Sequence, residues 1–389
     1  MEWKEVPIEN VLDALIDYRG KTPQKSVKGI PTLSAKSVKM NFIDYSQCYY
    51  ISESEYKKFM VRGFPQIGDV LLTTEAPLGV VARLNRDNIA LGQRLITLRG
   101  KKGILDNGYL LYYLQSPHGQ HNLKSKESGT TVTGIKQAEF RKLVIPLPPF
   151  NVQQKIARIL SALDDKIELN NAINRNLEEQ AQALFKNWFI DFAPFGGQMP
   201  KDWKNGKLSD IAEYEKEKID IAKLNIETYY STENMLSNKA GVSKATNLPT
   251  IEQTTRCFPG ETIISNIRPY FKKIFYCTEK IAGCSTDVLC FKPKKESFSI
   301  YNYSLLYSND FFDYMVKGSK GTKMPRGDKS QIMNYDVVVP TESVISDFNT
   351  VVSNILQQIS NNKKENEYLA KLRDTLLPDL MSGELCLNT

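Results

Sequence analysis

The sequence predicts a mixed α/β or α+β protein with two similar domains and two long antiparallel coiled-coil helices, related by an internal pseudo-twofold repeat. Three observations support this fold class. The sequence matches itself once, each copy begins with short apolar runs separated by Gly and Pro, and each copy ends in a sustained heptad pattern. At 389 residues, the chain is also long enough for two or three domains.

The internal repeat appears when the sequence is compared with itself at a shift of 192 residues. Matches then fall in one register without gaps, and they include Gly68 with Gly260, Tyr109 with Tyr301, Gly129 with Gly321, and Pro148 with Pro340. So long a period, present only twice, argues against a solenoid. We therefore expect a first domain at 1–148, a first long helix at 149–193, a second domain at 194–340, and a second long helix with the C-terminal tail at 341–389.

Each domain is expected to combine strands and short helices. The β-type runs include DVLLTT, GVVARL and RLITLRG in the first copy, and TIISNI and DVLCFKP in the second. A helical patch follows in each copy, GYLLYYLQS and YNYSLLYSNDFFDYM. A polar segment rich in Gly, Thr and Lys comes next. It is followed by a strand that leads into a helix start, in LVIPLPPF and DVVVPTE.

The long helices are predicted by apolar residues that alternate at spacings of four and three. The helix-pairing positions are Leu160, Leu163, Ile167, Asn170, Asn174, Leu177 and Leu184 in the first helix, and Val352, Ile355, Ile359, Asn362, Asn366, Leu369 and Leu376 in the second. A helix of ~40 residues is roughly 60 Å long. Because each helix has an apolar face to cover, we expect the two helices to pack against each other.

Two asparagines interrupt the apolar face of each helix at matching places. A buried asparagine lowers stability unless its amide is paired, so such residues usually fix the register and the choice of partner. In an antiparallel pair, Asn170 and Asn174 would lie beside Asn362 and Asn366, and amide–amide hydrogen bonds would prevent sliding. The alternative is that both asparagine segments are solvated turns of bent helices.

The composition favours a cytoplasmic protein with a polyanionic partner. The net charge of +7 and the pI near 8.8 are a mild excess that hints at such a partner without establishing it. Six scattered cysteines without a Cys-x-x-Cys pair are typical of reduced thiols. The N-terminal MEWKEVPIENVLDAL lacks the apolar core of a signal peptide, and no apolar run is long enough for a membrane span.

Catalytic motifs are not evident. The two histidines, His118 and His121, lie in SPHGQHN without a third ligand nearby, so a surface loop is favoured over a metal site. So few histidines also argue against Ser-His-Asp and Cys-His chemistry. LPPF lacks the leading Asn or Asp of an amino-methyltransferase motif, PDLMSGELC lacks the lysine of a metal nuclease, and no Walker loop occurs. We expect no catalytic residue, metal or cofactor in this chain.

Basic and small polar residues gather at matching places in both copies, in Asn122–Lys136 and Met315–Lys329, and again in Asn266–Lys273. Glycine amides, Lys and Thr make phosphate contacts, whereas Arg and Lys can read guanine edges. A charge run is usually a solvated loop, but repetition in register favours DNA binding. The candidates, chosen by charge and position, are Lys36, Arg83, Arg94, Lys124, Lys126, Thr130, Thr131, Lys136, Arg268, Tyr270, Lys272, Lys273, Lys317, Lys320, Thr322, Lys323 and Arg326.

Together these features resemble the specificity subunit of type I restriction–modification enzymes. The resemblance rests on IPLPP, QQKIARIL, KIELN and INRNLE in the first copy and on the ending LRDTLLPDLMSGEL, and it covers essentially the whole chain. The second copy departs from the family pattern, because VVVPTESVISDF stands where the family usually shows Pro-Pro and a Glu-Gln pair.

The resemblance implies that the domains at 1–148 and 194–340 are target-recognition domains and that the helices are spacers. It implies a non-catalytic subunit that binds double-stranded DNA, with each domain reading one half of a split target. Two methyltransferase subunits would dock on the helices and methylate adenine with S-adenosylmethionine. Restriction subunits would then join and cleave with ATP. These cofactors, and Mg²⁺, would belong to the partner subunits.

Two sets of residues on the first helix bear on this docking. An outer face expected to stay free for partner helices carries Glu178, Glu179, Gln182 and Lys186. An aromatic cluster that would be either core or docking surface comprises Phe185, Trp188, Phe189 and Phe192.

Two other functions were weighed against DNA reading. One is a non-catalytic scaffold that spaces two protein-binding domains, for which salt-independent binding to random duplex would be evidence. The other is part of a self-sufficient DNA methyltransferase, and the lack of cofactor and catalytic motifs argues against it.

Overall fold

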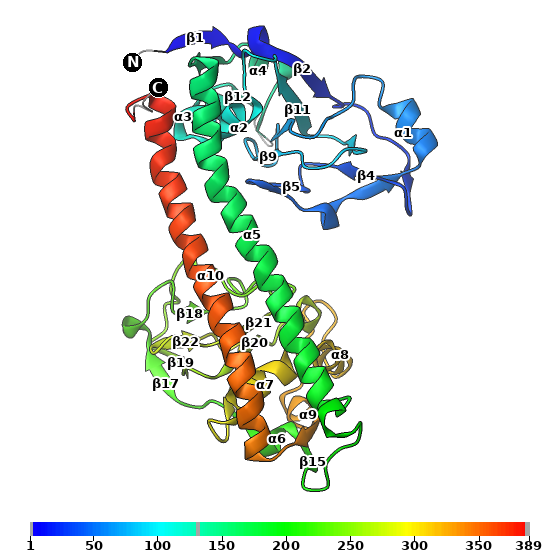
Figure 1. Ribbon diagram of the computed structural model, residues 1–389, viewed down its shortest axis with the longest axis vertical. Coiled ribbons are helices and arrows are strands. Elements are labelled where there is room, and N and C mark those ends of the chain that lie inside the picture. The colour runs from blue at the N-terminus through cyan, green and yellow to red at the C-terminus, as the bar shows by residue number, and fades with distance from the viewer. Residues whose placement is uncertain (1–2, 130–132, 386–389) are drawn as a thin grey trace. The chain divides into compact units, whose positions relative to one another are not determined.

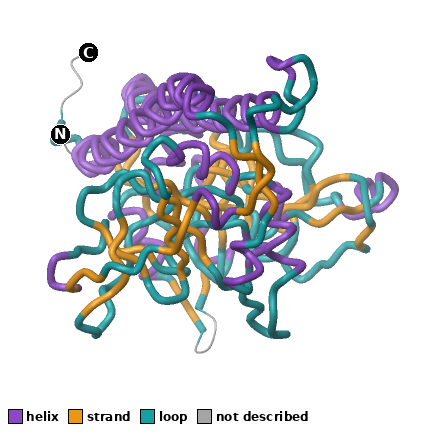
Figure 2. Tube along the Cα trace, turned by 90° about the horizontal axis from the view of Figure 1, so that it is seen from below, coloured by secondary structure: helices purple, strands orange, loops and turns teal. Residues whose placement is uncertain are grey.

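The chain forms two compact units in the computed structural model, which describes residues 3–129 and 133–385. The first unit comprises Met1–Asn171 and Lys363–Thr389, and the second comprises Ala172–Asn362. Each unit therefore contains one mixed domain and a part of both long helices. Strands, short helices and loops are interleaved in the mixed domains, whereas the long helices run without a break (Figure 1 and Figure 2).

The first unit is built around a four-stranded antiparallel main sheet in the order β2 (Leu12–Asp17), β11 (Leu95–Gly100), β8 (Val70–Thr73) and β9 (Val81–Arg83). A second sheet has the order β10 (Ala90–Leu91), β4 (Ile30–Leu33), β7 (Tyr49–Ile51) and β3 (Lys25–Ser26). Three ribbons pair β1 (Lys4–Pro7) with β14 (Val144–Leu147), β5 (Val38–Lys39) with β6 (Phe42–Ile43), and β12 (Glu127–Ser128) with β13 (Gly134–Ile135). The short helices are α1 (Glu53–Phe59), α2 (Asn107–Gln115), α3 (Pro117–Ser125) and α4 (Gln137–Arg141).

The central strands β8 and β11 of the main sheet are buried on both faces, which explains why they are continuous apolar runs rather than alternating ones. Successive side chains of a strand point to opposite faces. Val70 and Leu72 of β8 lie in one core cluster together with Tyr109 of α2. Leu71 lies in another cluster together with Leu33 of the second sheet. The main sheet thus separates two cores.

The second unit repeats this plan. Its main sheet has the order β16 (Ala212–Tyr214), β23 (Val288–Pro293), β20 (Thr262–Ser265) and β21 (Ile274–Tyr276). Its second sheet has the order β17 (Lys218–Asp220), β19 (Gln253–Cys257), β22 (Ala282–Cys284) and β18 (Tyr229–Tyr230), and a ribbon pairs β15 (Lys204–Lys207) with β24 (Asp336–Val339). The short helices are α6 (Leu208–Ile211), α7 (Phe298–Leu306), α8 (Asn309–Lys317) and α9 (Lys329–Met333).

The two copies agree in the main sheet and differ in the second sheet. Tyr109 Oη donates a hydrogen bond to the carbonyl of Pro146 at 2.9 Å, and the matching Tyr301 donates to the carbonyl of Val338 at 2.5 Å. In the second sheet, however, β4 lies between β10 and β7 in the first unit, whereas β22 lies between β18 and β19 in the second. The duplicated framework therefore carries two differently built second sheets.

One segment of the first domain differs from its sequence-based expectation. His118 and His121 lie on helix α3 rather than in a surface loop, so that expectation was wrong. Ser116 Oγ accepts a hydrogen bond from the backbone N–H of Gly119 at 3.1 Å, and Pro117 occupies the first turn. Because Ser is a favoured N-cap and Pro a favoured first helical residue, this dipeptide starts a helix.

The corresponding segment of the second domain contains two helices where one helical patch was expected. Ser308 separates α7 from α8, and its Oγ accepts a hydrogen bond from the backbone N–H of Phe311 at 3.1 Å. The N-cap serine therefore begins a new helix at the same place in both copies.

The expected long helices are α5 (Phe150–Phe189) and α10 (Glu342–Ser382). Within the first unit, Leu160 of α5 shares a core cluster with Leu380 of α10. Within the second unit, Phe185 of α5 packs against Phe348 of α10 with ring centroids 6.2 Å apart. Asn170 of the first unit lies against Asn366, and Asn174 of the second unit lies against Asn362. Within each unit the α10 number therefore falls as the α5 number rises, so the helix segments are antiparallel.

The outer face of α5 is covered in the second unit by helix α7. Tyr307 donates a hydrogen bond from Oη to the Glu178 carboxylate at 2.9 Å, and Gln182 Nε2 donates to the carbonyl of Ser304 at 3.1 Å. The expectation that Glu178 and Gln182 are free for a partner helix was therefore wrong, because Ser304 of α7 and the following Tyr307 contact them, whereas Glu179 on the same helix is exposed.

The C-terminal end of α5 belongs to the core of the second unit. Phe185 and Phe189 are buried there, and Trp188 and Phe192 pack against the same cluster. Lys186 forms a surface ion pair with Asp191 at 2.7 Å, and its side chain stays 66% exposed. Of the two alternatives left open for the aromatic cluster, the structure favours core.

Candidate nucleic-acid interface

The basic segments form a hairpin at the same place in both units. In the second unit, the backbones of Lys320 and Arg326 exchange two hydrogen bonds of 2.9 Å, which closes the loop between them. We call Lys320–Arg326 the basic loop. In the first unit Ser128 pairs with Gly134 in the ribbon β12–β13, and the shift of 192 residues relates this pair to Lys320 and Arg326. Thr130 and Thr131 fall outside the described residues.

A β-bridge attaches each hairpin to the loop that follows a central strand of the main sheet. Ile267 bridges Arg326 in the second unit, and Glu75 bridges Gly134 in the first. The shift of 192 also relates these two bridges. The structure thus brings together candidate segments that are distant in sequence, and it does so in the same way in both copies.

Arg268 is held against the basic loop by its backbone and its side chain. Its backbone, at φ 51°, lies in the left-handed region, and its N–H donates to the carbonyl of Pro325 at 2.7 Å. Its guanidinium Nη2 donates to the carbonyl of Lys323 at 3.2 Å, while Nε is buried without a hydrogen-bond partner among the described residues. The planar donors of Arg268 are therefore positioned before any ligand arrives.

The charges on and beside the basic loop divide into paired and available ones. Lys320 forms an ion pair with Asp328 at 2.6 Å, and that hydrogen bond raises the pKa of Lys320. Arg326 pairs with Asp287 at 3.0 Å. Lys323 in the loop and Lys317 at the end of α8 are exposed and form no ion pair within the described part of the chain. Lys317 and Lys323, with the exposed Thr322, are therefore available for phosphate contacts.

Lys273 is engaged inside the second unit. Its Nζ donates to the backbone carbonyl of Thr232 at 2.5 Å, and burial lowers its pKa. Tyr270 stays 47% exposed beside Phe271, with ring centroids 4.8 Å apart. Of these two candidates, Tyr270 is the one that offers an accessible surface.

Lys272 shares an acceptor with a second lysine that the sequence did not single out. The Nζ atoms of Lys272 and Lys239 donate to Asn309 Oδ1 at 3.0 and 3.1 Å. Burial, followed by the repulsion from Lys272, lowers the pKa of Lys239 to about 8. This pair could not be found from the sequence, because the tertiary fold alone brings the two lysines together.

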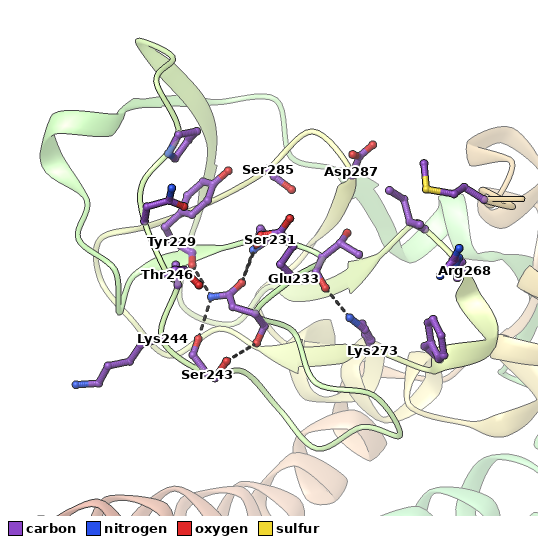
Figure 3. Close-up of a pocket in the computed structure, with 18 residues that line it drawn as sticks. Tyr229, Ser231, Glu233, Ser243, Lys244, Thr246, Arg268, Lys273, Ser285 and Asp287 are labelled. Atoms are coloured by element: carbon purple, nitrogen blue, oxygen red, sulfur yellow. Dashed lines mark hydrogen bonds between the residues drawn. The ribbon is translucent and has the colours of Figure 1, made fainter. Parts of the chain in front are cut away.

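A polar cleft of about 640 Å³ opens beside the basic loop in the second unit (Figure 3). Arg268, Met324 and Phe271 line one part of it, and the turn that contains Glu233 lines another. Ser285 and Asp287 contribute from the loop before β23. The cleft offers both donors and acceptors. The sequence search for basic residues missed Glu233 and Asp287, because that search did not consider acidic side chains.

The first-unit candidates are placed as follows. Arg94 pairs with Glu75, the bridge residue, at 2.9 Å and so lies beside the hairpin of that unit. Arg83 pairs with Asp165 of α5 at 3.8 Å. Four further candidates are exposed: Lys36 between β4 and β5, Lys124 on α3, and Lys126 and Lys136 next to the hairpin strands. Among the charged candidates of the first unit, all but Lys36 and Arg83 therefore lie on or close to the hairpin or on the neighbouring α3.

The asparagines of the two long helices are hydrogen-bonded to one another in the first unit. Asn170 is buried, and its Nδ2 donates to Asn366 Oδ1 at 2.9 Å and to Glu365 Oε2 at 2.7 Å. Asn366 Nδ2 in turn donates to Asn171 Oδ1 at 2.9 Å. The hydrogen bond from Asn170 lowers the pKa of Glu365. Sequence reasoning identified Asn170 and Asn366 but missed Asn171 and Glu365, which lie outside the heptad positions.

In the second unit, Asn362 Nδ2 donates to Asn174 Oδ1 at 2.8 Å. Both side chains are buried, which favours paired amides over solvated turns. Gln358 Nε2 also donates to Asn362 Oδ1 at 2.8 Å, so the Asn362 amide is engaged on both sides.

The described residues were also compared with the requirements of a metal site and of a membrane span. Among the described residues, no group of three or more His, Cys, Asp or Glu side chains is arranged to hold a metal ion. None of the helices in the described ranges is long and apolar enough to cross a membrane.

The sequence matches the family described as "Type I restriction modification DNA specificity domain" twice, at residues 1–179 and 200–372. It is 29% identical over 403 residues to the type I restriction enzyme MjaIX specificity subunit of Methanocaldococcus jannaschii, which covers 94% of this chain and 90% of that protein. It is 23% identical over 378 residues to the type I restriction enzyme HindI specificity subunit of Haemophilus influenzae, covering 77% of this chain and 82% of that protein.

A solved structure has the same fold. The crystal structure of the type I restriction–modification system S subunit from M. genitalium matches with a TM-score of 0.59 at 19% identity, and the match covers 98% of this chain and 96% of that one. The two family matches together include both mixed domains and most of the long helices.

Proposed function

This chain belongs to the type I restriction–modification DNA specificity family, as a specificity subunit with two target-recognition domains, and from that premise we propose how it works. Each target-recognition domain reads one half of a bipartite duplex target. The segments of α5 and α10 set the number of unread base pairs between the halves and dock methyltransferase subunits.

The observation that carries this proposal is the repeated hairpin. Both units hold a hairpin in a position related by 192 residues, attached by an equivalent bridge, and both have lysines or arginines beside it. Phosphate contacts fix the position of a protein on DNA, and base contacts then provide specificity. Two equivalent hairpins on one chain are suited to a DNA target that consists of two half-sites.

Catalysis and its cofactors are assigned to partner subunits. We propose that two methyltransferase subunits supply adenine methylation with S-adenosylmethionine, and that restriction subunits supply cleavage with ATP and Mg²⁺. The specificity chain itself then neither methylates nor cleaves, and it acts in the cytoplasm. Hydrogen bonds between Asn170 and Asn366 and between Asn174 and Asn362 support the pairing of these helices through their heptad positions. Docking therefore falls to their remaining exposed faces.

The test combines the purified chain with methyltransferase subunits and maps modified bases by sequencing. We expect methylated adenines in a bipartite motif with the complex and no methylation with either component alone. A single contiguous methylation motif would refute the proposal that each domain reads a separate half-site. Binding to random duplex that does not weaken with rising salt would instead support a scaffold, because phosphate contacts release counterions and give a steep salt dependence.

A further inference from the structure

Glu233 is an exposed carboxylate on the wall of the cleft beside the basic loop. It forms no ion pair or hydrogen bond within the described residues, whereas the second cleft carboxylate, Asp287, is paired with Arg326 at 3.0 Å. Figure 3 shows Glu233 close to Ser231 in the lining of the cleft. The cleft therefore contains one carboxylate whose charge is not neutralised.

Hydrogen bonds on both sides hold the backbone of the turn that carries Glu233. The buried Asn234 accepts a hydrogen bond from the backbone N–H of Ser231 at 2.6 Å, and its Nδ2 donates to the carbonyls of Tyr229 and Ser243, both at 2.9 Å. Lys273 holds the adjacent carbonyl of Thr232 at 2.5 Å. Side chains that must discriminate between ligands are effective when the backbone beneath them is fixed in advance.

An unneutralised carboxylate in this position is informative because DNA is a polyanion. A carboxylate repels phosphate oxygens and cannot donate to base acceptors. The exocyclic amino groups, N4 of cytosine and N6 of adenine, are the base-edge groups in the major groove that donate to it. Arg268, which also lines the cleft, supplies donors that suit the N7 and O6 acceptors of guanine. The cleft therefore contains groups with complementary base preferences.

We propose that Glu233 is a specificity-determining residue of the second target-recognition domain, and that it accepts a hydrogen bond from the exocyclic amino group of a cytosine or adenine in its half-site. This proposal rests on the proposed function, since it requires that the second domain binds a duplex through this face. It goes further in two respects: the cleft is the surface that contacts base edges, and Glu233 selects bases that carry an exocyclic amino group.

The test uses the full chain assembled with methyltransferase subunits. Glu233→Gln and Glu233→Ala are compared with Glu252→Gln, which changes an exposed glutamate of the same unit outside the cleft lining. We expect both Glu233 variants to relax or change one cytosine or adenine position of one half-site, with a loss of discrimination of roughly 10- to 100-fold. The other half-site and the control should keep the wild-type pattern.

The outcomes separate the two proposals. If the wild-type complex gives no bipartite motif, the proposed function fails and this inference fails with it. If the wild type gives a bipartite motif and the Glu233 variants leave both half-sites unchanged, only this inference is overturned. Binding of the free chain to a random-sequence duplex gives a second measurement. Glu233→Ala should bind it more tightly than wild type if the carboxylate faces DNA, and equally tightly if it does not.

Discussion

Asn362 of α10 donates a hydrogen bond from Nδ2 to Oδ1 of Asn174 in α5 at 2.8 Å, and both side chains are buried. This hydrogen bond joins the two helices, so neither asparagine can be changed without affecting the other. A buried polar group that loses its partner is destabilising, whereas replacing both partners by apolar residues can be nearly neutral.

This pair predicts a difference between single and double variants. Asn362→Leu should lower the free energy of unfolding by about 1–3 kcal/mol, because Asn174 is left buried without its partner. The double variant Asn174→Leu/Asn362→Leu should recover most of that loss. Chemical denaturation measures both effects. Asn361→Leu changes an exposed neighbour on the same helix and is the control. A double variant as unstable as the sum of two single variants would contradict the pairing argument.

The ion pair between Arg373 and Asp164 makes a second prediction. Their Nη1 and Oδ1 atoms are 2.6 Å apart, with side chains 17% and 19% exposed, and Tyr112 Oη donates to the same carboxylate at 2.7 Å. Arg373→Met should destabilise the first unit by about 1–3 kcal/mol, because Asp164 loses its cation in a mostly buried place.

The matched control for Arg373→Met is Lys142→Met. The pair of Lys142 with Glu139 is 66% and 39% exposed, so solvent screens it and its loss should leave stability almost unchanged. Hydrogen exchange of the first unit would locate the effect. Equal destabilisation by both variants would show that burial does not govern these two pairs.

Glu261 predicts that the stability of the second unit depends on pH. Burial, opposed in part by hydrogen bonds from Cys290 and the backbone of Phe258, raises the pKa of Glu261 from 4.5 to about 7. The nearby Glu215 also raises it, and Lys292 lies 3.4 Å from Glu215. The folded state therefore binds a proton more tightly than the unfolded state. This stabilisation is complete below about pH 4.5 and is lost as pH rises through about 7.

Thermal unfolding followed by tryptophan fluorescence can test this effect, because Trp188 and Trp203 both lie in the second unit. The midpoint should fall as the pH is raised between these two values, and Glu261→Gln should flatten that dependence. A variant that keeps the full wild-type slope would assign the pH dependence to another group.

The basic loop predicts a change in salt dependence. Lys317→Gln and Lys323→Gln should weaken duplex binding by similar factors for all sequences, and each should reduce the slope of log K against log salt by ~0.9 if that lysine contacts one phosphate. Titrations by fluorescence anisotropy at several salt concentrations measure this slope. Lys295→Gln is the control, since Lys295 is exposed and lies close to Glu342 in an ion pair away from the basic loop. An unchanged slope would remove that lysine from the interface.

A helix insertion tests whether α5 and α10 act as a spacer. About four residues, one helical turn, added after Asn171 and after Asn362 should lengthen the unread gap in the methylated motif. The half-sites should stay the same, because the insertions lie outside both mixed domains. Altered half-sites would show that the helices do more than set a distance.

The sequence was informative where periodicity determines structure. The heptad pattern predicted α5 and α10, and the structure has long helices there. The apolar runs predicted β8, β11, β20 and β23, and the structure has buried strands there. The shift of 192 residues likewise aligned Tyr109 with Tyr301, and these two tyrosines form equivalent hydrogen bonds in the two units. The helices and strands could be predicted because neighbouring residues determine them, and the equivalent positions because the sequence is repeated.

The missed features depend on tertiary contacts or on unused local signals. The helix that bears His118 had a local signal in Ser116 and Pro117, which could have been applied. Glu178 seemed free because nothing in the sequence shows that Tyr307 lies beside it. Glu233 had no signal at all, since the turn around Asn234 and the distant Arg268 form the cleft only in the folded chain.

The ribbons β1–β14 and β15–β24 have a consequence for the history of such a protein. In each of them, the strand that opens a domain lies hydrogen-bonded beside the strand that closes it, as Lys4 does beside Leu147 and Lys204 beside Val339. The chain between the two strands of each ribbon therefore begins and ends at the same place, next to the long helices. Recombination that joins new genetic material at these borders could replace one reader and leave the frame intact. The two domains already differ in this way: their second sheets have different strand orders, although their main sheets have the same one.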